Sequence, residues 1–368
     1  MSRTTDCAFI VTHKTQKVKG NFSLAGEKME SNIEDNKNAE KMTIGDVAEA
    51  LGVSKTTVSR AISGKGRIGN ATRDKVLDFI NEHNYAPSAI AKGLAQSKTY
   101  NIGWVIPGDY SSANLPFFQK CLMGIAEMAS PMQYDILVLM VSENDISHLE
   151  RAVTNHKVDG VILGRTLKND LAVEYLLNVG LPFVAIGTVD DKRVVQIDND
   201  HRSACRELIS LLIMKGIRSM GLIGGSSSHT VTEHRLSGYK DAFTAAGIEL
   251  EDDTIFLDAG PGFRIDKAVE TLIMRKVQCI VCMDDSICVN ALNKLRRDGV
   301  RIPDDVKIAS LFNSPQLETG TPAVTSLNFD TATLGREACR ILMNYIDGKE
   351  VNKRTLLGYD IAIKDSTK

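Results

Sequence analysis

Hydrophobic residues recur along this 368-residue chain with two different periods, and the change between them divides the chain. From residue 101 onward, short apolar runs alternate with stretches in which apolar residues repeat every three or four positions. The short runs are typical of buried strands and the stretches of amphipathic helices. Strands that alternate with helices predict parallel sheets joined by right-handed crossovers.

The predicted strands of this region fall into two consecutive sets. The first comprises 102–106, 135–141, 160–163 and 182–186, and the second 220–223, 255–257, 279–283 and 306–311. These are too many strands for one modest sheet, so we expect two α/β lobes. Because ligands bind beyond the carboxyl ends of such strands, we expect a ligand between the lobes, where hinge closure traps it.

A different pattern precedes the sheets, where residues 43–70 read as two short helices joined by a tight turn. Gly52 suits the left-handed end of the first helix, and Ser54 is a good N-cap for the second. The second helix buries Val58 and Ile62. The apolar face of the first helix comprises Ile44, Val47, Ala48 and Leu51, at helical spacing.

The spacing within these two helices is that of a helix-turn-helix. Small Ala48 lets the second helix cross closely, the turn glycine follows four residues later, and branched Val58 comes six residues after that. In such a motif the second helix enters the major groove of DNA. Its outward side chains are donors and hydroxyls without an acid, which suits base edges and phosphates. The alternative interpretation is a helical hairpin within a core.

The segment reads T-I-x-D-V-A-x-x-x-G-V-S-x-x-T-V-S-R, followed by a Gly-rich link and T-R-x-x-V, and it resembles the headpiece of the lactose-repressor (LacI/GalR) family. The resemblance runs from about Met42 to the C-terminus. It implies a small all-α helix-turn-helix headpiece and an α/β core of two parallel-sheet lobes of periplasmic-binding-protein type. It also implies a hinge helix near 85–94, with Leu94 wedged into the minor groove. A frayed linker is the alternative for that segment.

Pattern and resemblance together give the expected domain boundaries. Residues 1–41 lack periodicity and read as a disordered extension, for which a native start at Met29 or Met42 is an alternative to a charged arm. The headpiece is expected at 42–84, the hinge helix and linker at 85–99, and the effector-binding and dimerisation core at 100–368. Within the core, lobe 1 is expected at about 100–199 and 328–350. Lobe 2 is expected at about 200–327 plus the C-terminal segment. Crossovers between the lobes are expected near 198–200, 327–329 and within 349–368.

DNA contacts are predicted for the outward face of the second helix, the link after it and, from the resemblance, the hinge helix. The predicted residues are Thr43, Ser54, Lys55, Thr56, Thr57, Ser59, Arg60, Arg67, Ala91, Lys92 and Leu94. Arg67 could also be part of an ordinary solvated loop. The expected partner is a near-palindromic double-stranded operator bound by a homodimer.

Loops after the strand ends supply the predicted effector site. Arg235 lies in an R-L-x-G sequence that matches the family's effector-contacting arginine, and its fork of donors suits sugar hydroxyls or a carboxylate. Asp285 matches an acidic position after a strand, and Phe117 a ring-stacking position; each could equally be a loop salt bridge or a core residue. The full predicted set is Phe117, Arg165, His229, Arg235, Asp285, Phe312, Asn313 and Phe329.

Two positions depart from the resembled family. Where its members commonly have an aromatic residue followed by an acid, this chain has Leu311-Phe312-Asn313, and where they often have a Gln near the third crossover, it has Asn328-Phe329. The pocket is therefore expected to be more apolar than a site for a free sugar, which argues against a simple monosaccharide. The hydroxyl-rich loop around His229 could hold an anionic group or be a flexible turn.

Charge is distributed unevenly along the chain. The net charge is −2, but residues 41–98 carry nine basic and five acidic residues, whereas 99–368 carry 29 basic and 35 acidic. A basic module on an acidic body fits a protein that touches DNA through one part only. No apolar run approaches the roughly 20 residues of a membrane helix, so we expect a cytoplasmic protein without a membrane partner.

Motifs for catalysis or metal binding are missing from the sequence. There is no P-loop, no G-x-G-x-x-G after a strand and no G-x-S-x-G. Cys279 and Cys282 have metal-site spacing, but alternation along a buried strand sends their sulfurs to opposite faces. We therefore expect a binding protein without catalytic residues, metal or cofactor. The alternatives are a carbohydrate-binding protein without a regulatory DNA role and a sugar-modifying enzyme.

Overall fold

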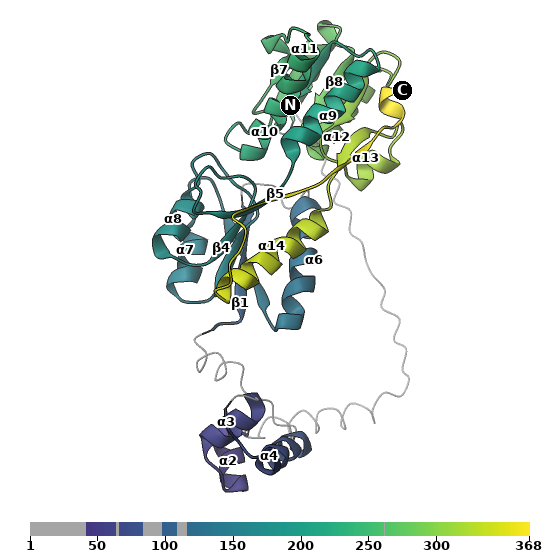
Figure 1. Cartoon of the computed structure of the whole chain (residues 1–368). Coiled ribbons are helices and arrows are strands. Elements are labelled where there is room, and N and C mark those ends of the chain that lie inside the picture. The colour runs from purple at the N-terminus through teal and green to yellow at the C-terminus, as the bar shows by residue number, and fades with distance from the viewer. Residues whose placement is uncertain (1–41, 64–65, 84–97, 109–115, 261) are drawn as a thin grey trace, which may run out of the picture. The chain divides into compact units, whose positions relative to one another are not determined.

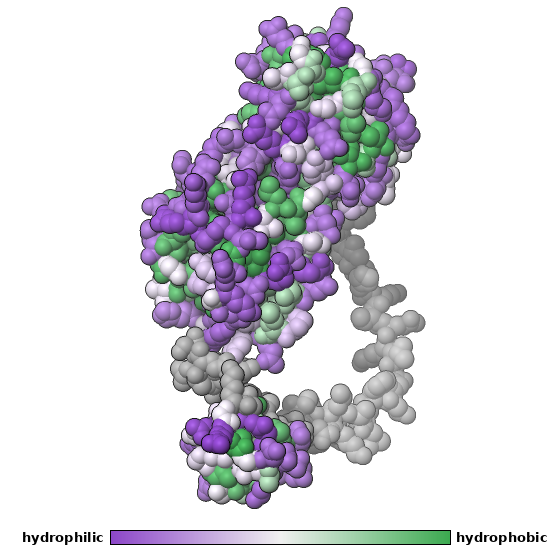
Figure 2. All heavy atoms as spheres, viewed as in Figure 1, coloured by the Kyte–Doolittle hydropathy of each residue, from purple (hydrophilic) through white to green (hydrophobic). Residues whose placement is uncertain are grey.

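The computed structural model describes residues 42–63, 66–83, 98–108, 116–260 and 262–368. The chain divides into two compact units, Met1–Lys92 and Gly93–Lys368 (Figure 1). The predicted residues Ala91, Lys92 and Leu94, the expected extension 1–41 and the proposed hinge helix lie outside the described residues. No described helix is long and apolar enough to cross a membrane, and hydrophilic residues cover most of the visible face of each unit (Figure 2).

The described part of the first unit is a bundle of three helices, of which the first two form the predicted helix-turn-helix. They are α2 (Ile44–Leu51), α3 (Lys55–Ser63) and α4 (Asn70–Glu82). The amide of Asp46 donates to the Thr43 side chain, and the Thr43 amide donates to the Asp46 carboxylate at 2.6 Å, which closes a capping box. Gly52 ends α2 in the left-handed conformation, with φ of 65°. The buried core comprises Val47, Ala48, Val58, Ala61 and Val76.

The second unit contains two parallel-sheet lobes, which confirms the predicted fold class. The strands of the first sheet lie in the order β11-β5-β4-β3-β1-β2 and are all parallel. They are β1 (Asn101–Pro107), β2 (Asp135–Val141), β3 (Gly160–Leu163), β4 (Phe183–Ile186), β5 (Val195–Asn199) and β11 (Arg354–Leu357). Side chains of α6 (Pro116–Ala129) and α14 (Thr331–Ile346) pack on one face, and those of α7 (Ser147–Thr154) and α8 (Leu171–Val179) on the other.

The second sheet repeats this plan, with strand order β12-β10-β9-β8-β6-β7 and only β12 antiparallel to its neighbour. Its strands are β6 (Met220–Ile223), β7 (Ile255–Phe256), β8 (Cys279–Cys282), β9 (Lys307–Ser310), β10 (Thr325–Asn328) and β12 (Asp360–Ala362). Helices α9 (His201–Met214) and α10 (Thr230–Ala245) cover one face, and α11 (Phe263–Met274) and α12 (Asp285–Arg297) the other; short α13 (Pro315–Thr319) follows β9. Cys279 and Cys282 belong to the cores on opposite faces, as strand alternation predicts.

The C-terminal segment crosses from the first lobe to the second within the expected stretch 349–368, but later than the expected boundary at about residue 350. Strand β11 pairs with β5 in the first sheet, whereas β12, three residues later, pairs with β10 in the second. Val351 and Leu357 pack on the first lobe's core. The sequence did not reveal strand β11 because it alternates between exposed and half-buried residues.

Each lobe contains one pair of helices that cross without side chains between their backbones. A methyl group built on Gly335 of α14 would overlap the carbonyl oxygen of Cys121 in α6, and one on Gly124 would overlap the carbonyl of Ala332. In the second lobe, a methyl group on Gly238 of α10 would overlap the carbonyl of Arg202 in α9. These glycines therefore fix how closely the helices beside the crossovers approach.

Gly335→Ala is expected to destabilise the core by about 1–3 kcal/mol, because the added methyl group forces two packed backbones apart. The free energy of unfolding from urea titration measures the effect. Gly260→Ala is the matched control, since nothing lies within 4 Å of the added methyl group there and its φ is unremarkable. Equal stability of the two variants would show that α6 and α14 separate without cost.

Candidate functional site

The exposed face of α3 is the candidate DNA-binding surface. Lys55, Thr56, Ser59 and Arg60 are exposed, and the helix carries no acidic residue. Arg60 runs along Gly66 in the link after α3. A methyl group built on this glycine would lie 3.2 Å from the Cδ atom of Arg60. Two cations and two hydroxyls on one helix face offer donors for phosphates and base edges.

Three other predicted DNA contacts have structural partners within the headpiece. The amide of Thr57 donates to Ser54 Oγ at 3.1 Å, and the two hydroxyls lie 2.9 Å apart, so this pair caps α3. Thr57 is half-buried rather than turned fully outward. Thr43 is exposed and caps α2, as described above. Arg67 is exposed in the link.

In the second unit, Arg235 is 8% exposed on α10, next to the carboxyl end of β8. Its Nη1 donates to the carbonyl of Met283 at 2.6 Å. Asp284 follows and caps α12 by accepting the Ile287 amide at 2.7 Å, and Asp285 is half-buried in the first turn. These residues bring one guanidinium and two carboxylates together at the strand end.

Burial dominates the electrostatics of this group. It raises the pKa of Asp284 and of Asp285 above the usual carboxyl value, and the nearby Arg235 opposes the rise in both. Burial likewise lowers the pKa of Arg235, and the charge of Asp284 is the largest influence that opposes this change. A polar ligand that replaces lost hydration with hydrogen bonds would find acceptors and donors at this place.

Three of the predicted effector residues form a continuous row of rings. Phe117 of α6 meets Phe312, which follows β9, edge to face with centroids 6.1 Å apart. Phe312 stacks on Phe329, which follows β10, at 6.1 Å with an interplanar angle of 18°. The row begins in the first lobe and continues over the ends of two strands of the second lobe. Each of the three side chains is partly exposed. We call these three residues the aromatic row.

Buried polar atoms without a protein partner border the aromatic row. The side chain of Asn313, next to Phe312, has an unpartnered Oδ1, and the His201 ring, 4.7 Å from Phe329, has an unpartnered Nδ1. Both polar atoms of Asn199, which is 2% exposed at the end of β5, and the Nε of Arg235 also have no partner. Since buried polar atoms in proteins are normally hydrogen-bonded, this grouping favours a ligand site.

Arg165 and His229, also predicted as effector contacts, lie where loops of the two lobes meet. Arg165 Nη1 lies 3.5 Å from His229 Nε2, which in turn lies 3.6 Å from Glu143 Oε1. Ser228 Oγ donates to the same Glu143 oxygen at 2.7 Å. The hydroxyls of Thr166 and Thr230 lie 2.6 Å apart, and Lys168 N–H donates to the Ser228 carbonyl at 3.0 Å. We call these contacts the inter-lobe clasp.

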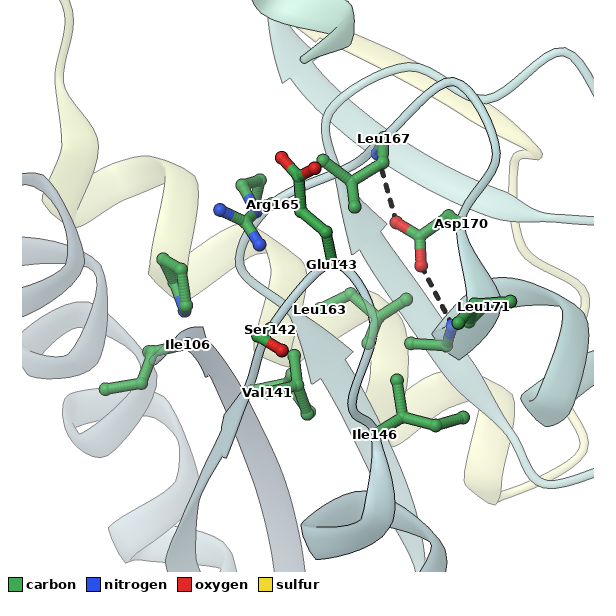
Figure 3. A pocket seen from close by; sticks show the side chains of 13 residues that line it. Ile106, Val141, Ser142, Glu143, Ile146, Leu163, Arg165, Leu167, Asp170 and Leu171 are labelled. Atoms are coloured by element: carbon green, nitrogen blue, oxygen red, sulfur yellow. Dashed lines mark hydrogen bonds between the residues drawn. The ribbon is translucent and has the colours of Figure 1, made fainter. Parts of the chain in front are cut away.

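The clasp borders a small pocket at the carboxyl ends of β1, β2 and β3 (Figure 3). Glu143 and Arg165 lie at its rim, while Ile106, Leu163 and Ile146 line its floor. Asp170 closes one side by accepting the amides of Leu167 and Ala172. Sequence reasoning did not identify Glu143, because a single carboxylate in a loop carries no motif.

The two units match two different family models. Residues 43–88 match the model described as bacterial regulatory proteins, lacI family, and residues 209–367 match the periplasmic binding protein-like domain. The chain is 29% identical over 335 residues to catabolite control protein A of Staphylococcus xylosus, with 89% of this chain and 99% of the relative covered.

Solved structures are similar over the same length. The complex of the transcriptional regulator CelR with cellobiose aligns with a TM-score of 0.66 and 27% identity, covering 88% of this chain and 99% of that one. The lac repressor dimer bound to operator and the anti-inducer ONPF aligns with a TM-score of 0.74 and 20% identity, covering 89% and 99%.

Proposed function

Because the chain belongs to the lacI family of bacterial regulatory proteins, whose members are DNA-binding transcriptional regulators and not enzymes, we propose that it represses transcription under the control of a small molecule. The acid-free, exposed face of α3, within the segment that matches the lacI family, carries this proposal. Lys55, Thr56, Ser59 and Arg60 are the proposed major-groove contacts.

On DNA, two copies are proposed to pair through their cores and to bind a near-palindromic operator with two headpieces. Arg67 adds a phosphate or base-edge contact after α3. The hinge helix expected near 85–94, outside the described residues, is proposed to form only on DNA, because so short a helix is unstable alone in water. Leu94 then wedges into the minor groove, with Ala91 and Lys92 beside it.

The effector is proposed to lie between the lobes, against Arg235, Asp285, Asn313 and the aromatic row. A sugar or sugar derivative is the favoured class, because donors and carboxylates together suit hydroxyl groups, and the similar regulator CelR was solved with cellobiose. The ligand controls operator binding if it has different affinities for the two arrangements of the lobes. Arg165 and His229 are proposed to act in the same closure through the inter-lobe clasp.

Selection from a random pool of DNA duplexes tests the regulator function. The purified full chain is expected to enrich a near-palindromic sequence and to bind it with an affinity that falls steeply with salt concentration, because Lys and Arg displace counterions from phosphates. A chain that binds sugars but enriches no sequence at any salt concentration would instead be a carbohydrate-binding protein without a DNA role.

A further inference from the structure

The aromatic row changes what the proposed effector site can hold. Phe312 and Phe329 lie at the two places where the sequence departs from the resembled family, and in this chain the two rings stack on each other. Each ring also packs on a neighbour: Phe312 on Phe117 of the first lobe, and Phe329 on His201. The two departures are therefore one physical feature, a continuous apolar surface of three rings.

This surface offers nothing to a hydroxyl group. A free monosaccharide carries hydroxyls around its whole ring, and any of them that faces three phenyl groups loses its hydrogen bonds to water without replacement. A flat aromatic ring has no such loss and gains from stacking or from edge-to-face contact. A pyranose can also pack one C–H face on a ring, but its rim hydroxyls then need partners that the row does not supply, whereas a planar aromatic ring presents no hydroxyl to the row. The row therefore favours a ligand with an aromatic face over a small free sugar.

Polar groups without partners occur at the strand ends on which the row lies and at neighbouring strand ends. The unpartnered Asn313 Oδ1 is adjacent in sequence to Phe312, and the unpartnered amide of Asn199 lies two residues before His201, which contacts Phe329. Arg235 keeps a free Nε, and Asp285 is half-buried beyond β8. These donors and acceptors fit hydroxyls, so the site has two unlike parts, one apolar and flat and one hydrogen-bonding.

We propose that the effector is a glycoside of an aromatic ring, whose sugar binds Arg235, Asp285 and the two asparagines and whose ring lies on the aromatic row. The proposal rests on the proposed function, because it assigns the ligand class of the same site. Phe312 and Phe329 are then the residues that determine specificity. Aryl O-glycosides and nucleosides share this chemistry, since both join a sugar to a planar ring.

Calorimetric titration of the full chain with matched ligand pairs tests this class. The pairs are phenyl and methyl β-D-glucopyranoside, phenyl and methyl β-D-galactopyranoside, and adenosine or cytidine against methyl β-D-ribofuranoside. In at least one series the aromatic member is expected to bind about tenfold more tightly than its methyl partner. The series in which this happens distinguishes an aryl glycoside from a nucleoside. Equal affinity within every pair, or no binding of any aromatic member, would overturn the proposal.

A substitution connects the preference to the row. Phe312→Leu keeps an apolar side chain but removes the ring, so the ratio of aromatic to methyl affinity is expected to fall about two- to tenfold. Phe256→Leu is the control, because Phe256 is also half-buried in the second lobe but packs on another core. An unchanged ratio in Phe312→Leu would remove the row from the site. Operator binding is measured on the same preparations without ligand, so loss of the DNA function is detected separately from a wrong ligand class.

Discussion

Arg60→Ala is expected to lower operator affinity about tenfold to a hundredfold, as loss of one specific base contact costs about 1–3 kcal/mol. Arg60 is exposed in the last turn of α3 and extends along Gly66, so its removal exposes no buried headpiece surface. The effect should be largest for the best operator and smaller for unrelated DNA, because a base contact carries sequence information and a phosphate contact does not. Fluorescence anisotropy with operator and scrambled duplexes measures both affinities.

Lys75→Ala provides the matched control for charge. Lys75 is exposed on α4, so the variant removes one cation from the same unit without touching the proposed recognition face. It is expected to weaken binding to operator and scrambled duplexes by a similar small factor. If Arg60→Ala shows only the same uniform weakening, Arg60 is a phosphate contact or none at all, and the proposed groove contacts must be reassigned.

The chain's periodicity was sufficient to predict the elements that bury apolar faces, but strand β5 shows where it fails. Residues Val195–Asn199 are all buried although Gln196, Asp198 and Asn199 are polar. Gln196 exchanges two hydrogen bonds with the backbone of Val189, at 3.0 and 2.9 Å. A strand that buries polar side chains has no continuous hydrophobic signature, so its burial could not be read from the sequence.

The candidate ligand site shows the same division. Arg235, Asp285 and the aromatic row could be selected individually from the resemblance to the family and from their positions near strand ends, which the topology of parallel sheets brings to one edge. That Phe117 contacts Phe312, or that Glu143 receives both Ser228 and His229, depends on how two lobes meet. Such contacts join residues about 85 to 195 positions apart in the chain, for which a single sequence has no local signal.

Arg235→Gln is expected to abolish the ligand response of operator binding and to weaken ligand affinity by roughly tenfold to a hundredfold, the range for a hydrogen bond from a charged group. The shorter amide cannot both reach the Met283 carbonyl, now 2.6 Å from Nη1, and present a donor to the ligand. The substitution also removes the cation that limits the rise in the pKa of Asp284 and Asp285 caused by burial.

The experiment must separate this loss of response from a loss of folding, because Arg235 is buried and its replacement leaves two half-buried carboxylates without their cation. The melting temperature of the variant is therefore expected to fall, while its operator affinity without ligand stays within about twofold of the parent, since the headpiece is a separate compact unit. Arg202→Ala, which breaks an exposed pair with Asp241 at 2.7 Å on the neighbouring helix α9, should change neither response nor stability by much. A folded Arg235→Gln protein that still responds normally would move the effector site away from α10 and β8, and the pocket beside Glu143 and Arg165 would then be the place to test next.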